Sequence, residues 1–324
     1  MIRLRYPHAL QAAIFFAFIV LAALVARAQQ LDISPKETLL NVTVVDGGGQ
    51  YVTGLGKTDF KVFDDTLPQE ITSFSNDDKA ASIGILLDLS ESMAEWARRG
   101  FTSRIVKQAV SRFTQLGGKG NEYFIVAFDA RPRLLLDWTD DVSAINSALA
   151  QLAEVKPKGN TALFDACYLG AEHLPRSKHD KRVLILITDG EDNASKQSFE
   201  KARRVMRESG SLIYGVLIRT VTQGGVVSEA LAEESKSVLL DLALPSGGAV
   251  WFPEKPSEVL AAFESIAQEL HHQYMIGFSS MNAGAGEKWH RIKVVVTSAQ
   301  NAQREPRHLS IRSRQGYYSS ATSH

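Results

Sequence analysis

The chain has little of what marks several large classes of protein. Cys167 is its single cysteine among 324 residues, so no internal disulfide can form; it lies in an apolar helical pattern, and we expect it to be buried in the core. The 36 basic and 36 acidic residues cancel at pH 7, so the strongly basic field of a nucleic-acid-binding protein is missing. Apolar residues make up 44% and charged residues 22%, the composition of a soluble globular protein.

Long apolar runs are also missing, apart from one at the N-terminus. Arg3 and Arg5 precede the run "ALQAAIFFAFIVLAALVA", and "ARA" at 26–28 fits the small-x-small cleavage rule. We therefore expect residues 1–28 to be a signal peptide and the mature chain to be exported, either periplasmic or secreted, with no membrane span after cleavage. An uncleaved anchor is the alternative, because the run is just long enough to span a bilayer.

Residues 80–270 alternate short apolar runs with longer amphipathic ones. The runs "SIGILLDLS", "EYFIVAFDA", "KRVLILITDG" and "SLIYGVLI" are typical of strands buried on both faces. "RPRLLLDW" contains Pro132, which fits an edge strand and not a central one. Segments with helical periodicity lie between these runs. The order predicts an α/β domain with a doubly wound, mostly parallel sheet and helices on both faces.

The two flanks of this domain have a different pattern. Residues 29–79 and 271–318 contain short alternating strands and Gly-rich turns, such as "NVTVVDGGGQYVTG" and "HRIKVVVTS". Two or three strands rarely form an independent sheet. We therefore expect the flanks to pair into one small β-sandwich, with the α/β domain inserted between them. Residues 319–324 remain as a tail.

Oxygen-bearing side chains gather in three loops of the predicted α/β domain. "DLSES" places Asp88, Ser90 and Ser92 at alternate positions after a strand. "KGNTAL" places Thr161 before a helix, and "TDGED" places Asp189 after the most apolar strand. Because the carboxyl ends of parallel strands share one edge of a sheet, these side chains should meet there. Carboxylates and hydroxyls without His or Cys suit Mg²⁺ or Mn²⁺ better than Zn²⁺, and few anionic ligands leave the cation able to accept a carboxylate from another molecule.

Each motif alone has a simpler interpretation. Ser90, Ser92 or Thr161 would also serve as a helix N-cap, and Asp189-Gly190 would also form a plain turn. Two enzyme classes fit poorly. A phosphatase of the haloacid dehalogenase type needs a second Asp where Ser90 stands, and a serine hydrolase needs the glycines that "DLSES" lacks.

Together, "DLSES", "GNTAL" and "TDGED" resemble the metal-ion-dependent adhesion site of von Willebrand factor A domains. That pattern is Asp-x-Ser-x-Ser, then a Thr, then an Asp, and every position is filled here. The resemblance implies that Ser90 and Ser92 touch the metal directly, Thr161 directly or through water, and Asp88 and Asp189 mostly through water. It also implies metal-dependent adhesion to a protein partner and no catalysis.

The flanks extend the resemblance to nearly the whole mature chain. "NVTVVDGGGQYVTGLGKTDFKVFDDTLPQEITSFS" and "RSRQGYY" are similar to segments of secreted bacterial proteins related to the von Willebrand factor A family. We therefore predict an exported, non-enzymatic protein that binds a protein partner through the metal and an acidic residue of that partner. Two alternatives remain open: an envelope scaffold in which the metal only stabilises loops, and a metal-dependent hydrolase.

Overall fold

The computed structural model describes residues 37–91, 93, 103–153, 159–218, 229–280, 288–297 and 309–319. The expected signal peptide, Ser92 and nearly all of the expected tail lie outside these residues. No helix within the described ranges has the length and hydropathy that crossing a bilayer requires.

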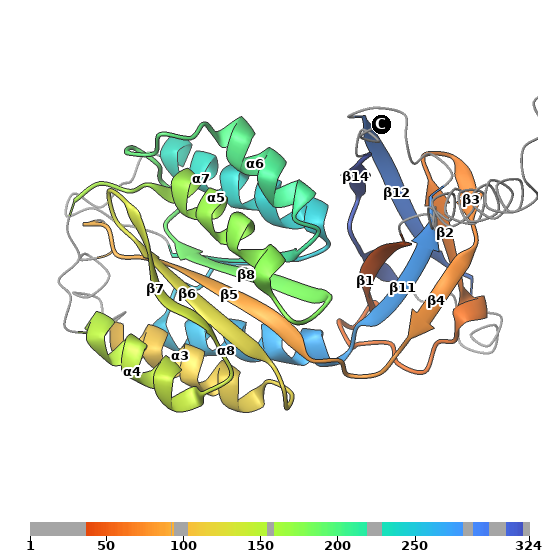
Figure 1. Cartoon of the computed structure of the whole chain (residues 1–324), viewed down its shortest axis with the longest axis horizontal. Helices are drawn as coiled ribbons and strands as arrows, with labels where there is room; N and C mark the ends of the chain where they lie inside the picture. Colours follow the sequence, from red (N-terminus) through yellow and green to blue (C-terminus); the bar gives the residue numbers. More distant parts are fainter. Residues whose placement is uncertain are drawn as a thin grey trace, which may run out of the picture. The chain divides into compact units, whose positions relative to one another are not determined.

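A six-stranded sheet forms the centre of the α/β part (Figure 1), in the order β10-β9-β8-β5-β6-β7. All neighbours in it run parallel except β7, which pairs antiparallel with β6 at one edge. The prediction of a mostly parallel sheet, with the Pro132 segment at its edge, is confirmed. The strands are β5 (Ala81–Asp88), β6 (Glu122–Phe128), β7 (Pro132–Thr139), β8 (Lys181–Thr188), β9 (Leu212–Leu217) and β10 (Val250–Trp251).

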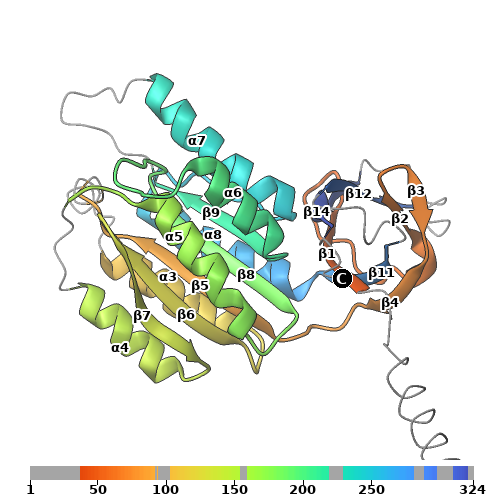
Figure 2. The same cartoon turned by 45° about the horizontal axis from the view of Figure 1, so that its top comes forward.

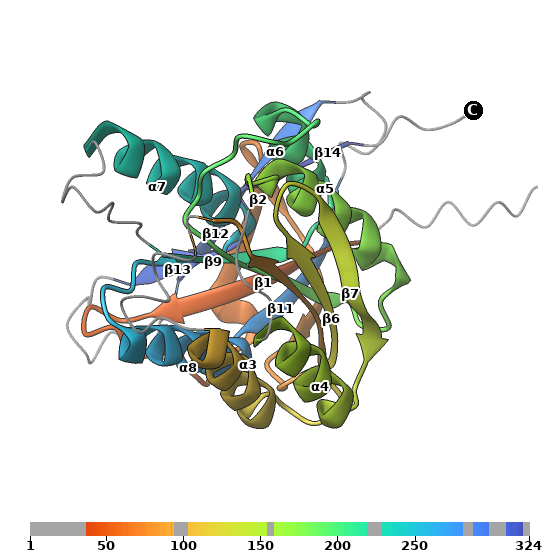
Figure 3. The ribbon, with the colours of Figure 1, turned by 90° about the vertical axis from the view of Figure 1, so that its left-hand side faces the viewer.

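Helices cover both faces of this sheet, as predicted (Figures 1 and 3). The side chains of β5 alternate between two cores: Ile85 packs with α3, α4 and α8, whereas Leu86 packs with α5, α6 and α7. Cys167 is fully buried in the second core, as expected. The helices are α3 (Ser103–Leu116), α4 (Val142–Ala153), α5 (Leu163–His173), α6 (Phe199–Glu208), α7 (Glu229–Ala243) and α8 (Pro256–His271), with short 3-10 turns η1 (Lys57–Asp59), η2 (Leu174–Arg176) and η3 (Leu244–Ser246).

The flanks form a β-sandwich in which each sheet contains strands from both ends of the chain (Figure 2). One sheet has the order β13-β1-β11-β4 and the other β14-β12-β2-β3. Apolar side chains of both sheets share one core, which includes Leu40, Val62, Ile276 and Ile292. The predicted insertion of the α/β part between paired flanks is therefore confirmed. The strands are β1 (Glu37–Val45), β2 (Phe60–Asp64), β3 (Leu67–Gln69), β4 (Ile71–Ser75), β11 (Tyr274–Ser279), β12 (Trp289–Val296), β13 (Ser310–Arg312) and β14 (Gly316–Tyr318).

A buried polar network joins the two parts where α8 leads into β11. Oε1 of Glu269 accepts hydrogen bonds from the Thr43 hydroxyl (3.1 Å) and the Tyr214 hydroxyl (2.9 Å). Its Oε2 forms an ion pair with the guanidinium of Arg312. Burial, followed by the charge of Glu269, raises the pKa of Tyr214 well above its usual value. Residues from α8, β9, β1 and β13 thus meet around one carboxylate.

Candidate metal site at the carboxyl edge of the parallel sheet

Asp88 and Asp189 lie at the carboxyl ends of two adjacent strands. Asp88 is the last residue of β5, and Asp189 directly follows β8. The strands pair in parallel with Leu87 opposite Ile187, so both carboxylates emerge at the same edge of the sheet. Their exposed fractions are 1% and 4%, which is unusual for acidic residues.

Hydroxyl and amide groups hold the Asp88 carboxylate in place. Its Oδ1 accepts a 2.9 Å hydrogen bond from the Ser90 N–H, and its Oδ2 accepts a 2.6 Å hydrogen bond from the Thr188 hydroxyl. Burial, followed by the negative charge of Asp189, nevertheless raises the pKa of Asp88 to about 7. The groups with the largest effect on this pKa are a carboxylate, hydroxyls and a backbone N–H, and none of them is cationic. A cation between the two carboxylates would relieve their repulsion.

Ser90 lies in a tight turn directly after β5. Its side chain is buried, and its carbonyl accepts a 3.1 Å hydrogen bond from the Met93 N–H. The next residue, Glu91, donates its N–H to the carbonyl of Gly159 (3.0 Å), which ties this turn to the loop that carries Thr161. Ser92 and residues 94–102 lie outside the described residues, so the capping alternative for the two serines stays untested.

Thr161 is held by the loop that follows β8. Its N–H donates to Oδ1 of Asn193 (2.8 Å), and its carbonyl accepts from the N–H groups of Asn193 and Ala194, both at 3.0 Å. The capping alternative for Thr161 is wrong, because Ala162 occupies the N-cap of α5 without a side-chain hydrogen bond. The first turn of α5 is instead capped from the β8 loop: Oδ1 of Asp192 accepts from the Phe164 N–H (3.1 Å).

The turn after Asp189 requires glycine. Gly190 has φ +81°, and a Cβ atom there would lie 2.8 Å from the carbonyl oxygen of Ser235. The Gly190 N–H donates to the Thr188 hydroxyl (3.1 Å), and the Glu191 N–H donates to Oδ1 of Asp189 (3.2 Å). The turn predicted for Asp189-Gly190 is therefore present, and it leaves the Asp189 carboxylate buried at the edge of the sheet.

The structure thus gathers Asp88, Ser90, Thr161 and Asp189 on loops that are hydrogen-bonded to one another, and all four side chains are buried. The donor atoms are hydroxyl and carboxylate oxygens, which fit a hard divalent cation. Sequence reasoning missed Thr188 and Asn193, which position these residues. The only signal for Thr188 was its place at the end of the most apolar strand, directly before Asp189.

Residues 83–191 match the family model described as von Willebrand factor type A domain. The comparison with curated proteins finds no match.

Several solved structures are similar to this chain. The conserved hypothetical protein BatB from Bacteroides thetaiotaomicron is 18% identical, with 59% of this chain and 97% of that chain covered and a TM-score of 0.46. The von Willebrand factor domain of the type V pili tip protein Mfa5 from Porphyromonas gingivalis is 15% identical, with 58% and 94% covered and a TM-score of 0.47. Proximal thread matrix protein 1 from the mussel byssus, with a zinc-occupied MIDAS motif, is 21% identical, with 63% and 48% covered and a TM-score of 0.48.

Proposed function

We propose, from the premise that residues 83–191 belong to the von Willebrand factor type A domain family, that this protein binds a protein partner through a divalent cation. The cation, Mg²⁺ or Mn²⁺, would be held at the carboxyl edge of the parallel sheet. The observation that carries the proposal is the burial of two carboxylates side by side at this edge, surrounded by hydroxyl groups. The proposed site residues are Asp88, Ser90, Ser92, Thr161 and Asp189.

The proposed ligand set keeps most of the charge of the cation available. Ser90 and Ser92 offer neutral hydroxyl oxygens as direct ligands, and Thr161 offers a third, directly or through water. Asp88 and Asp189 act mostly through bound water. A cation with neutral direct ligands attracts an anionic oxygen strongly, so an acidic side chain of the partner fits the remaining position. The bound cation supplies this attraction and no bond-breaking step.

A metal titration tests the first part of the proposal. Calorimetric titration of Mg²⁺, and separately Mn²⁺, into metal-stripped protein should give saturable binding that Ser90→Ala abolishes. Ser198→Ala is the matched control, because the Ser198 hydroxyl accepts a hydrogen bond from the Lys201 N–H at the start of α6 and is not among the proposed ligands. Equal binding by the parent and Ser90→Ala would refute the site.

Peptide selection tests the second part. Displayed peptide libraries with a fixed Asp or Glu should be enriched over libraries with Asn or Gln in Mg²⁺, and chelator should abolish the enrichment. Ser90→Ala should have the same effect as chelator. Enrichment that neither chelator nor Ser90→Ala changes would instead favour the scaffold alternative, in which the cation only stabilises loops.

A further inference from the structure

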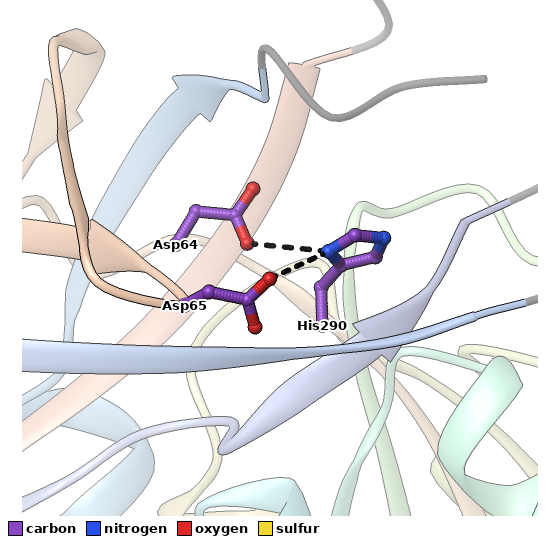
Figure 4. Close-up of side chains that lie close together, drawn as sticks. All are labelled: Asp64, Asp65 and His290. Atoms are coloured by element: carbon purple, nitrogen blue, oxygen red, sulfur yellow. Dashed lines mark hydrogen bonds and ion pairs between the residues drawn. The ribbon is translucent and has the colours of Figure 1, made fainter. Parts of the chain in front are cut away.

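A second group of metal-ligand side chains lies in the β-sandwich, outside the proposed metal site at the carboxyl edge of the parallel sheet, which we call the rim site. Asp64 is the last residue of β2, Asp65 follows it in the turn to β3, and His290 lies on β12. One ligand atom from each of the three lies within 4.8 Å of the others. Figure 4 shows both carboxylates directed at the same ring nitrogen of the histidine.

Among the described residues, Asp64 uses one carboxylate oxygen for hydrogen bonds and the other for none. Its Oδ2 accepts from the Ser280 hydroxyl (2.6 Å) and the Tyr317 hydroxyl (2.7 Å). Its Oδ1 accepts no hydrogen bond from the part of the chain that the structure describes, although the side chain is completely buried. This oxygen lies 3.9 Å from Nδ1 of His290.

Asp65 has the same division of roles between its two oxygens. Oδ1 accepts a 2.9 Å hydrogen bond from the Arg291 N–H, whereas Oδ2 lies 3.1 Å from Nδ1 of His290. Asp65 has φ +54°, a left-handed conformation, and its N–H donates to the Arg291 carbonyl (2.6 Å). These hydrogen bonds to the next residue along β12 hold the turn so that Oδ2 faces the imidazole.

The hydrogen bonds among the described residues do not satisfy every buried polar atom of this cluster. Nδ1 of His290 can carry at most one proton, and Asp65 at 3.1 Å is within hydrogen-bond distance of it while Asp64 at 3.9 Å is not. Within the described ranges the buried Oδ1 of Asp64 thus has no donor, which is costly for a charged group. Two carboxylates and a neutral imidazole carry a charge that one divalent cation would neutralise.

We propose that Asp64, Asp65 and His290 bind a divalent cation of the zinc type. Around a tetrahedral Zn²⁺ with bonds of about 2.0 Å, ligand atoms lie about 3.3 Å apart. The observed separations of 3.1 and 3.9 Å lie on either side of that value. Imidazole with carboxylates suits Zn²⁺, in contrast to the oxygen-only rim site.

The surroundings of the cluster supply what such a site needs. Ser280 and Tyr317 orient the Asp64 carboxylate from outside, as the outer partners of metal ligands do. The Asp65 side chain is 39% exposed, which gives the cation a route from solvent and leaves a position for water. Nε2 of His290 is buried without a partner among the described residues, and it would carry the ring proton when Nδ1 binds the cation. The cation would join the β2–β3 turn to β12.

Zinc titration into the metal-stripped protein tests the proposal, with equilibrium dialysis for stoichiometry and the visible spectrum of Co²⁺ as a probe of ligand geometry. Asp65→Asn is the mild variant, because Asn also tolerates the left-handed conformation and the side chain is partly exposed. His290→Gln removes the nitrogen ligand. His271→Gln is the matched control, since Nδ1 of His271 also contacts a carboxylate, Asp78 (2.6 Å), without belonging to a three-ligand group in the described residues.

We expect Asp65→Asn and His290→Gln to remove one zinc equivalent or to raise its Kd at least about 100-fold. Loss of a group that only hydrogen-bonds to a metal ligand already lowers metal affinity about 10–100-fold, and loss of a ligand itself should cost more. His271→Gln should leave that equivalent unchanged. Ser90→Ala should also leave it unchanged. A wrong proposal for this site can therefore be told apart from a wrong proposal for the rim site. Zinc binding identical in parent and Asp65→Asn, or no bound zinc in any of these proteins, would overturn the proposal.

Discussion

The hydroxyl of Thr188 donates a 2.6 Å hydrogen bond to Oδ2 of Asp88, across the boundary between β8 and β5. The same hydroxyl accepts the Gly190 N–H (3.1 Å), so one side chain connects the first and third loops of the proposed metal site. Asp88 and Thr188 are 100 residues apart in the chain, and parallel strand pairing makes them neighbours.

Thr188→Val should weaken the rim site while keeping the shape of the side chain. The variant leaves Oδ2 of Asp88 and the Gly190 N–H without a partner, and we expect the Kd for Mg²⁺ to rise about 10–100-fold. The free energy of unfolding should fall by about 1–3 kcal/mol. Titration calorimetry and urea unfolding measure the two effects. Thr188→Ser keeps the hydroxyl and should behave like the parent. Equal Mg²⁺ affinities of Thr188→Val and Thr188→Ser would show that the hydroxyl has no role in Mg²⁺ binding.

Asn193→Ala should affect both stability and metal affinity, because it removes the acceptor of the Thr161 N–H. We expect a loss of about 1–3 kcal/mol in the free energy of unfolding and a Kd for Mg²⁺ at least about tenfold higher. Asn121→Ala is the matched control, since Oδ1 of Asn121 accepts the Ala81 N–H (2.7 Å) at the opposite end of β5. That variant should lose similar stability and keep its Mg²⁺ affinity. A similar drop in affinity in both variants would point to a general effect of destabilisation.

Arg312→Met should destabilise the junction between the α/β part and the sandwich. It leaves the buried Glu269 carboxylate without its cation, a change that costs about 3–5 kcal/mol in comparable pairs. The double variant Arg312→Met/Glu269→Gln should recover part of this loss, because the remaining group is neutral. Urea unfolding of the two single variants and the double variant measures the coupling energy.

The exposed ion pair of Arg112 with Glu264 (3.1 Å) is the comparison for this prediction. Because both side chains are about half exposed, Arg112→Met should cost less than about 1 kcal/mol. Equal losses for Arg312→Met and Arg112→Met would show that the burial of Glu269 has no energetic consequence.

Lys181 should make stability depend on pH in the alkaline range. Its ammonium is buried and donates to the Leu270 carbonyl near the end of α8. Burial lowers the pKa of Lys181 from 10.5 to about 8, against the opposing charges of Asp78 and Glu269. Charged Lys181 therefore destabilises the fold below pH 8, and this cost disappears as the pH rises from about 8 to 10.5.

The size of this effect is on the order of 3 kcal/mol, from a pKa shift between 10.5 and about 8. Denaturant unfolding at a series of pH values should show that the parent gains stability over this range relative to Lys181→Met. The substitution keeps an apolar stem of similar length and removes the titrating group. Parallel pH curves for the two proteins would mean that Lys181 is solvated in the folded state.

The sequence alone determined the class of fold and the edge on which the candidate rim site lies. Continuous apolar runs that alternate with amphipathic ones are local patterns, and they predicted a parallel sheet because such runs are buried on both faces. The strand-end rule then placed Asp88 and Asp189 on one edge, where the structure has them buried. Alternation in the flanks likewise predicted their strands, and the small number of strands predicted their pairing.

Only the tertiary structure decided which side chains hold these residues and which groups meet across the sandwich. Ala162, and not Thr161, occupies the N-cap of α5, because the β8 loop supplies the capping oxygen. His290 and Asp65 are 225 residues apart, and no local pattern relates them. Strand pairing fixes such distances, since the register of β12 against β2 sets which side chains of the two flanks face one another. The sequence therefore determined which apolar segments are buried, and the pairing of strands decided what each buried polar group contacts.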